Sequence, residues 1–443
     1  MTATWANMTA ADLGREIEKG RIHPVELAEF FLDRIETHPL AGRIFARATP
    51  SRARGEAMAA AARAKAGLRK GLLDGVSISW KDLFDTAGVA TEAGSALLKG
   101  RTPDRDATVL QTATLGGLVC LGKTHMSELA FSGLGLNPVT ATPPCLNDDR
   151  AVPGGSSSGA AASVAFGLAP AAIGSDSGGS VRIPAAWNDL VGLKTTAGSL
   201  PLAGIVPLFA SFDTIGPLAH SVEDCGLLLA ALHGRLPADL AGAGLAGKRL
   251  AVLETMALDD LREQPAKGFD DAVARLSRAG AEVHRLTVPE VVEAVSLSAI
   301  LCTSEAYGTW RETIERAPEK MFPRILERFR SGGTFLAADY VAGWQRLREI
   351  RAIWADRSAA FDAVILPTAP ILPPDAHRLM TDDAYYVSEN LLALRNTRVA
   401  NMLGLCALTL PTSQPSCGIS LMAAPGEEAR LLRLGAAAEK ALR

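Results

Sequence analysis

The feature that constrains this chain most is a stretch, residues 154–184, in which two glycine turns carry serines. The turns read GGSSSG at 154–159 and GGS at 178–180, and mostly small residues fill the interval between them. Glycine is favoured where the backbone takes a positive φ or approaches a ligand closely, and successive backbone N–H groups in such turns can bind an oxygen anion. The pattern predicts that both turns belong to one site.

Three other interpretations compete with this one. Loops that bind phosphate are followed by a Lys-Ser or Lys-Thr pair, which neither turn has. Residues 155–159 also fit G-x-S-x-G, a nucleophile elbow centred on Ser157, but that elbow follows a buried strand, and residues 147–153 are mostly polar and end in proline. Taken alone, each turn could equally be a tight turn that happens to contain serine.

A third segment upstream decides between these interpretations. Residues 75–81, GVSISWK, alternate apolar and polar residues with the period of a half-buried strand, which places Lys81 on the same face as Ser77 and Ser79. This lysine strand, the turn at 154–159 and the segment DSGGSVR at 176–182 follow one another as in the amidase signature family of serine hydrolases, which the chain resembles. The similarity is strong over about residues 75–224 and weaker elsewhere.

The resemblance implies a site built from two serines and a lysine. Ser180 would be the nucleophile, Lys81 the base and Ser156 the bridge between them, with a cis peptide bond before Ser156. A serine hydroxyl must hand its proton to a base as it attacks. Lys81 can accept a proton only when neutral, so burial has to lower its pKa from the usual value of about 10.4.

The resemblance also assigns roles to the neighbours of the proposed nucleophile. Backbone N–H groups are expected to stabilise an oxyanion, and they belong to Ser177, Gly178, Gly179 and Ser180 itself. Three further residues are expected to hold the turns in place: Ser157, Asp176 and Arg182.

The long loop at residues 125–153 is a candidate wall for a substrate pocket. Loops of this length within compact domains are usually functional. The residues that could contact a substrate are apolar or aromatic: Met126, Phe131 and Leu134 in the loop, and Tyr307 and Trp310 further along the chain. The alternative, that the apolar loop residues only attach the loop to the core, has equal weight.

The composition excludes several classes of protein. With 48% hydrophobic residues, 21% charged residues and a formal net charge of −3, nothing indicates a surface for nucleic acid or membrane. Six cysteines form no C-x-x-C pair, so we expect neither a metal site nor a cofactor. The N-terminus lacks the pattern of a signal peptide and no run of about 18 apolar residues occurs, which predicts a cytoplasmic protein, a monomer or homodimer.

The pattern of elements predicts an α/β fold with a central mixed sheet flanked by helices on both faces. Helices are expected within the first 70 residues, where Thr9 and Asp12 make a capping box, and a β-α-β unit over 247–288. An amphipathic helix over 336–359 precedes a strand at 363–368. We expect a single amidase domain, 1–443, with its signature core at about 75–224 and a part that shapes the substrate site at about 290–443.

These observations predict hydrolysis of the C–N bond of a small apolar or aryl amide, and of esters or carbamates (urethanes), through an acyl-enzyme. An alternative is the glutaminase (A) subunit of a tRNA-dependent amidotransferase. Against it, Ile183 stands where those subunits commonly have glutamine, and residues 414–421 depart from their usual pattern. A catalytically inactive binding protein is a third class, which the intact Lys81, Ser156 and Ser180 argue against.

Overall fold

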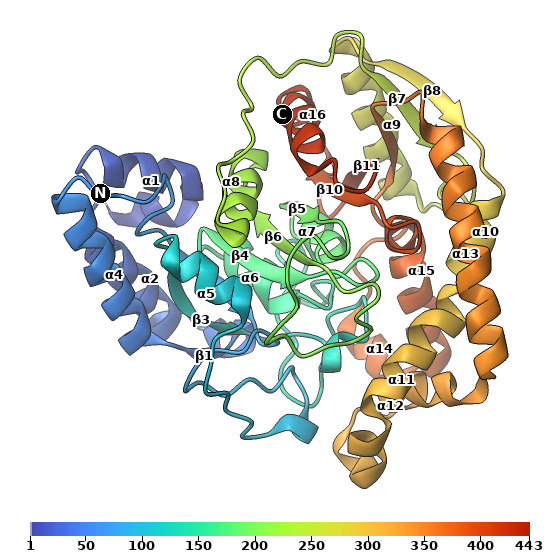
Figure 1. Ribbon diagram of the computed structural model, residues 1–443, viewed down its shortest axis with the longest axis horizontal. Helices are drawn as coiled ribbons and strands as arrows, with labels where there is room; N and C mark the ends of the chain where they lie inside the picture. The colour runs from blue at the N-terminus through green and yellow to red at the C-terminus, as the bar shows by residue number, and fades with distance from the viewer. Residues whose placement is uncertain (1) are drawn as a thin grey trace.

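The computed structural model describes residues 2–443. Its strands are β1 (Phe45–Ala48), β2 (Ser77–Lys81), β3 (Val119–Thr124), β4 (Ala171–Ser175), β5 (Val191–Lys194), β6 (Ile215–Ala219), β7 (Arg249–Leu253), β8 (Glu282–Leu286), β9 (Ala363–Pro367), β10 (Cys406–Pro411) and β11 (Gly418–Ala423). Within these residues, the eleven strands form one sheet in the order β1-β3-β2-β4-β6-β5-β10-β11-β9-β7-β8 (Figure 1).

The sheet mixes parallel and antiparallel pairs, as the sequence predicts. β2 lies parallel to both β3 and β4, and β7 lies parallel to both β8 and β9. The remaining neighbours, including all of those in the centre of the sheet, are antiparallel. The parallel β7–β8 pair confirms the β-α-β unit expected over 247–288, because such a pair needs a crossover helix between its strands.

Helices surround this sheet. They are α1 (Ala10–Glu18), α2 (Pro24–Thr37), α3 (Ala41–Ile44), α4 (Pro50–Lys65), α5 (Thr108–Leu115), α6 (Ser158–Ala165), α7 (Arg182–Trp187), α8 (Val222–His233), α9 (Glu263–Arg278), α10 (Glu290–Ser296), α11 (Ser298–Arg316), α12 (Pro323–Arg330), α13 (Ala337–Ser358), α14 (Ala376–Thr381), α15 (Asp383–Met402) and α16 (Glu428–Leu442). No helix in residues 2–443 combines the length and the apolar character needed to cross a membrane.

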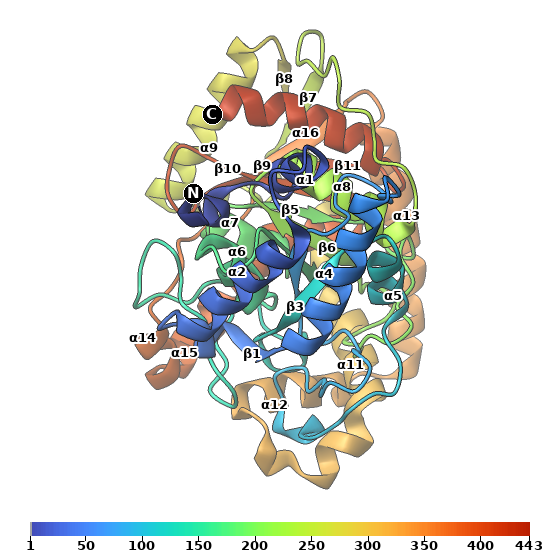
Figure 2. The same cartoon turned by 90° about the vertical axis from the view of Figure 1, so that its left-hand side faces the viewer.

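Both faces of the sheet are covered. Leu408 of β10 contacts Gly435 of α16, whereas its neighbour in the strand, Thr409, lies beside Gly418 close to Ala186 of α7. Successive residues of a strand point to opposite faces, so α16 and α7 lie on opposite sides. The N-terminal helices α2 and α4 and the C-terminal helices α10 to α13 lie at opposite ends of the molecule (Figures 1 and 2).

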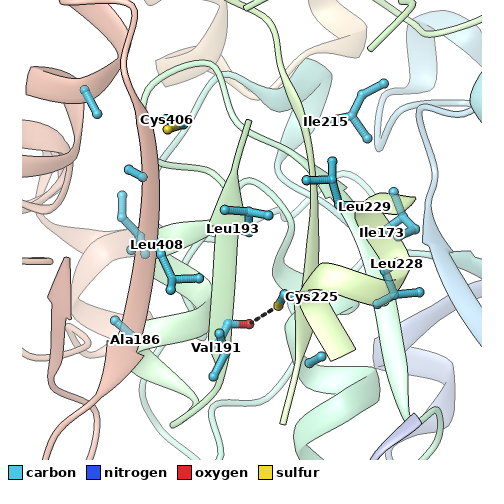
Figure 3. Close-up of a cluster of buried hydrophobic side chains, with 14 of the residues drawn as sticks. Ile173, Ala186, Val191, Leu193, Ile215, Cys225, Leu228, Leu229, Cys406 and Leu408 are labelled. Atoms are coloured by element: carbon cyan, nitrogen blue, oxygen red, sulfur yellow. Dashed lines mark hydrogen bonds between the residues drawn. The ribbon is translucent and has the colours of Figure 1, made fainter. Parts of the chain in front are cut away.

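The main hydrophobic core lies against the middle strands. Figure 3 shows part of it, where Leu193 of β5, Ile215 of β6 and Leu408 of β10 gather near α8. Cys225 of α8 donates a weak hydrogen bond from its thiol to the carbonyl oxygen of Val191 at 3.8 Å. A smaller cluster of mainly alanine and valine lies between α6, α7 and the sheet. Small residues there let both helices approach the strands closely, which brings the turns that precede these helices up to the sheet.

Several local expectations are confirmed and others need correction. Thr9 caps α1 by accepting a hydrogen bond from the Asp12 N–H at 3.0 Å, as predicted. The strand with the lysine is buried on both faces rather than half-buried, because it lies inside the sheet between β3 and β4. Leu336 is 68% exposed and precedes α13 instead of joining its apolar stripe. The segment 372–391, expected to be a loop, is largely helical.

Candidate active site

The sheet brings Lys81 to the edge where both serine turns meet. Lys81 ends β2, and because β2 and β4 run parallel, their carboxyl ends lie at the same edge of the sheet. Its side chain is fully buried. The Lys81 Nζ donates hydrogen bonds to the Oγ of Ser156 at 2.7 Å and to the Oγ of Ser175, the last residue of β4, at 2.8 Å.

The surroundings of Lys81 make it a base near neutral pH. Burial lowers the pKa of its ammonium group to about 7, although the buried carboxylates of Asp176 and Asp213 act in the opposite direction. Neither carboxylate forms an ion pair with it, and both side-chain partners are neutral hydroxyls. Because a hydroxyl can donate to a neutral amine as well as accept from an ammonium group, these contacts suit both protonation states of the lysine.

The first glycine turn holds Ser156 against its neighbours through backbone contacts. The peptide bond between Gly155 and Ser156 is cis, as the resemblance implies. A Cβ on Gly155 would lie 2.6 Å from the backbone nitrogen of Gly135, so only glycine fits there. The Ser156 carbonyl accepts a hydrogen bond from the Ser127 N–H at 3.1 Å, which ties the turn to the loop at 125–153.

Ser157 connects the first turn to the second. Its N–H donates to the carbonyl oxygen of Ser180 at 3.2 Å. Its hydroxyl donates to the carbonyl oxygen of Ser175 at 3.1 Å, and the Ser175 N–H donates back to that hydroxyl at 3.3 Å. The sequence-predicted serines therefore converge on the end of β4, and Ser157 faces the backbone instead of a cavity.

The second turn is organised by the carboxylate of Asp176. This carboxylate accepts hydrogen bonds from the N–H groups of Gly179 at 2.8 Å and Val181 at 3.1 Å. It also pairs with the guanidinium group of Arg182 at 3.0 Å. Burial opposes the charge, but the Arg182 guanidinium outweighs it and holds the pKa of Asp176 well below the usual range. A buried ion pair with this many hydrogen bonds fixes the shape of the turn.

Helix α15 supports the same turn from the C-terminal part of the chain. Arg182 donates to the carbonyl oxygen of Thr397 at 2.9 Å and to the side-chain oxygen of Asn401 at 2.6 Å. The Thr397 hydroxyl donates to the carbonyl oxygen of Gly178 at 2.7 Å. A Cβ on Gly179 would lie 2.1 Å from that hydroxyl, so the close approach of α15 requires glycine.

The backbone N–H groups of this turn are not equivalent. That of Gly179 is already bonded to Asp176. Those of Ser177, Gly178 and Ser180 have no hydrogen-bond acceptor among residues 2–443, and all three residues line one cavity. The Ser177 hydroxyl donates to the buried carboxylate of Asp213, whose pKa burial raises. The N–H groups that remain free can stabilise negative charge on a bound oxygen.

The cavity beside Ser180 has a volume of about 220 Å³. Much of its wall is apolar and comes from distant segments: Phe131, Leu208, Phe209, Cys302, Leu391, Leu394 and Met402. Two arginines, Arg328 of α12 and Arg398 of α15, line it as well. Such a volume suits a small molecule, with a mixture of apolar surface and a few polar groups.

The five residues proposed for substrate contact do not lie together. Phe131 lines the cavity. Met126 and Leu134 are buried in the core without lining the cavity, and Tyr307 and Trp310 on α11 do not line it either. Met126 packs beside Gly94, whereas the Trp310 Nε1–H donates to the carbonyl oxygen of Pro207 at 2.9 Å.

Other residues at the site are absent from the set that the sequence predicts: Ser175, Asp213, Arg328, Thr397, Arg398 and Asn401. Ser175 could have been found, because it ends the strand that delivers Asp176 and must lie at the same edge as Lys81. The others lie more than 30 residues from the signature motifs and show no local pattern. Among residues 2–443, no group of three or more histidine, cysteine or acidic side chains could hold a metal ion.

Comparison with known proteins now assigns the family. The family model described as Amidase matches residues 26–432. The protein belongs to the amidase signature family. As a member, it is a hydrolase of carbon–nitrogen bonds that acts on amides.

Members of the amidase signature family with different activities resemble this chain. A 2-amino-5-chloromuconic acid deaminase of Comamonas testosteroni is 35% identical over 395 residues, which cover 86% of this chain and 85% of that protein. The A subunit of the glutamyl-tRNA(Gln) amidotransferase of Marinobacter nauticus is 31% identical over 477 aligned positions, covering 96% of each chain. The solved peptide amidase of Stenotrophomonas maltophilia superposes with a TM-score of 0.84 at 26% identity, covering 99% of this chain and 98% of that one.

Proposed function

We propose that this amidase signature enzyme hydrolyses a small amide through an acyl-enzyme on Ser180, with Ser156 and Lys81 as its proton relay. The observation that supports this most strongly is the 2.7 Å contact between the Lys81 Nζ and the Ser156 Oγ, made by a lysine whose pKa burial lowers to about 7. A general base works best when its pKa lies near the pH at which the enzyme operates.

The first half of the reaction forms the acyl-enzyme. Neutral Lys81 accepts the proton of Ser156, which accepts the proton of Ser180 as the Ser180 Oγ attacks the amide carbonyl carbon. The carbonyl oxygen becomes an oxyanion that the free N–H groups of the turn at 177–180 stabilise. When the C–N bond breaks, Ser156 donates its proton to the leaving nitrogen and regains one from the Lys81 ammonium group.

The second half regenerates the enzyme. A water molecule gives one proton through Ser156 to Lys81 while its oxygen attacks the acyl carbon. The tetrahedral intermediate then collapses, the bond to the Ser180 Oγ breaks, and Ser180 recovers its proton through the same relay as the acid leaves. No step requires a redox or metal cofactor. The same sequence of steps would cleave an ester or a carbamate, since each passes through an equivalent tetrahedral intermediate.

The apolar wall of the cavity supports a substrate with an aryl or alkyl part. Phe131 and Phe209 face each other edge-on, with ring centroids 5.9 Å apart, and both line the cavity. We further propose that residues 1–443 act as one amidase domain, a monomer or homodimer in the cytoplasm, in which about 75–224 supply the chemistry and about 290–443 shape the substrate site.

Labelling with a fluorophosphonate, followed by peptide mass spectrometry, tests the mechanism. We expect an adduct on Ser180 that forms much more slowly in Lys81→Ala and Ser156→Ala. The Ser158→Ala variant is the matched control, because Ser158 belongs to the same turn but its hydroxyl donates towards the carbonyl oxygen of His125. Labelling on Ser157 would favour the elbow interpretation, and no labelling of the folded protein would contradict the proposal.

The second candidate function is that of a glutaminase in a larger amidotransferase, which the relative from Marinobacter nauticus favours. The side chain of Ile183 argues against it: it is buried, lies next to the Cα atoms of Gly179 and Gly133, and offers no polar group to a glutamine side chain. Turnover of an aryl anilide by the isolated protein, compared with release of ammonia from glutamine, separates the two functions. Glutamine as the preferred substrate, with a partner required, would overturn our assignment.

A further inference from the structure

Two arginines in the wall of the Ser180 cavity have no acidic partner. Arg328 comes from α12 and Arg398 from α15, and both side chains line the cavity together with Ser180. No carboxylate of residues 5–443 lies within 4 Å of either guanidinium group. In contrast, Arg330 on the same short helix as Arg328 pairs with Glu315 at 2.7 Å, so the absence is specific to the arginines at the cavity.

The contacts that these arginines do make hold them in place and leave their charge uncompensated. Arg328 donates to the carbonyl oxygen of Phe131 at 2.8 Å, and its guanidinium carbon lies 4.3 Å from the centroid of the Phe131 ring. Arg398 makes no hydrogen bond to residues 2–443. Burial, and then the nearby charge of Arg398, lowers the pKa of Arg328 to about 9, which still leaves both side chains charged at neutral pH.

Two like charges in one partly buried cavity are unfavourable unless a bound anion compensates them. The planar guanidinium group matches a carboxylate through two parallel hydrogen bonds, which makes arginine the usual choice for recognising one. The position agrees with a substrate role: a Cβ built on Gly178, in the turn with the free N–H groups, would lie 3.9 Å from the Arg398 Cγ. A ligand anion at the arginines would therefore lie close to the bond being cleaved.

We propose that Arg328 and Arg398 bind a carboxylate of the substrate, so that the enzyme hydrolyses an amide that also carries a free carboxylate. This inference rests on the proposed function and names its substrate class. Cavity size limits the substrate to a short chain or a single ring, since the volume is about 220 Å³. The phenylalanine side chains contact the apolar part, the arginines bind the carboxylate, and Ser180 attacks the amide carbon.

Matched substrates test the proposal. Glutaric mono-p-nitroanilide carries the carboxylate on its acyl part, and pentanoyl-p-nitroanilide is its neutral counterpart. N-pentanoyl-4-aminobenzoate carries the carboxylate on the leaving amine, and pentanoyl anilide is the neutral counterpart of that compound. We expect kcat/KM to favour the anionic member of at least one pair by about tenfold or more, a ratio in line with the usual strength of charged hydrogen bonds. A preference for the neutral member of both pairs would overturn the proposal.

Substitutions then locate the effect. Arg328→Gln and Arg398→Gln should each lower the anionic-to-neutral ratio of kcat/KM by about tenfold. Arg330→Gln on α12 and Arg395→Gln on α15 remove an arginine from the same helices without touching the cavity, and should leave the ratio unchanged. Equal ratios in all four variants would show that the cavity arginines do not select the substrate.

A binding measurement separates this inference from the proposed mechanism. Calorimetry with Ser180→Ala should detect saturable binding of glutarate, which Arg398→Gln in the same background weakens by about tenfold or more. If glutarate binds in this way but fluorophosphonate does not label the wild-type Ser180, the serine mechanism fails and the carboxylate site stands. If labelling succeeds while glutarate does not bind and no anionic substrate is preferred, the carboxylate site fails and the hydrolase stands.

Discussion

The floor and the wall of the cavity differ in how their charges are satisfied. We define the floor as Lys81 with the turns at 154–159 and 176–182, and the wall as the residues of α11, α12 and α15 that line the cavity. In the floor, the charged pair Asp176 and Arg182 is buried and fully bonded. In the wall, two arginines lack an acidic partner. A structure that is electrostatically complete can position reacting groups, whereas one that is incomplete can select a ligand.

The largest expected effect is in the floor. Ser180→Ala should lower kcat for any hydrolysed amide by about 10⁴-fold or more, because no other group can form the acyl-enzyme. Hydrolysis of an anilide followed by absorbance measures this, and the melting temperature should stay close to that of the wild type because the 4% exposed hydroxyl has no protein acceptor that packing depends on. Activity within a few fold of the wild type would place the nucleophile elsewhere.

Lys81→Met should reduce kcat by about 10² to 10⁴-fold, the usual contribution of a general base. The pH dependence of the wild-type enzyme is the sharper measurement. Protonated Lys81 cannot accept the serine proton, so kcat/KM should be low in acid, rise with pH through about 7 and then level off. A rate that falls as the pH rises through this range would contradict the assignment of Lys81 as the base.

Arg182→Met probes the electrostatic completeness of the floor. It leaves the buried Asp176 carboxylate without its cation, which should cost about 3 to 5 kcal/mol of unfolding free energy. Urea denaturation measures the loss. Arg330→Gln removes the partner of a surface pair and should change stability by less than about 1 kcal/mol. Similar effects of the two substitutions would remove the distinction between the buried pair of the floor and an exposed pair.

Phe131→Leu gives the smallest effect and tests the apolar part of the wall. Removing part of the ring should lower kcat/KM for an aryl amide by about tenfold, the scale of a lost hydrophobic contact in a pocket. Phe329→Leu is the matched control, because Phe329 packs against Phe131 with centroids 4.7 Å apart but does not line the cavity. We expect Phe329→Leu to alter stability more than specificity.

The same division separates what the sequence predicts from what it does not. The floor is encoded in three short motifs whose glycines and serines have few alternative explanations, so the motifs alone identify Lys81, Ser156 and Ser180 as a candidate site. The wall is built from single residues on helices whose periodic pattern reports only which side is buried. Arg328 and Arg398 are 70 positions apart in sequence, and nothing local in either helix indicates that they share a cavity.

The fold shows a parallel contrast. The β-α-β unit around residues 247–288 was predictable because its two strands and helix are adjacent in sequence. The antiparallel centre of the sheet was not, since β5 pairs with β10 across more than 200 residues. Short strands such as β5 carry little pattern of their own, and their pairing depends on packing between distant segments.

The bonds between Arg182 and α15 also set an order in time. Arg182 bonds to Asn401, which lies 219 residues later in the chain. During translation at about 5 to 20 residues per second, roughly 10 to 40 s separate the synthesis of these two residues. Throughout that interval the nascent chain already contains its complete set of reactive serines and the lysine, yet the turn that carries Ser180 lacks its last support. The enzyme thus becomes competent only when its final segments leave the ribosome.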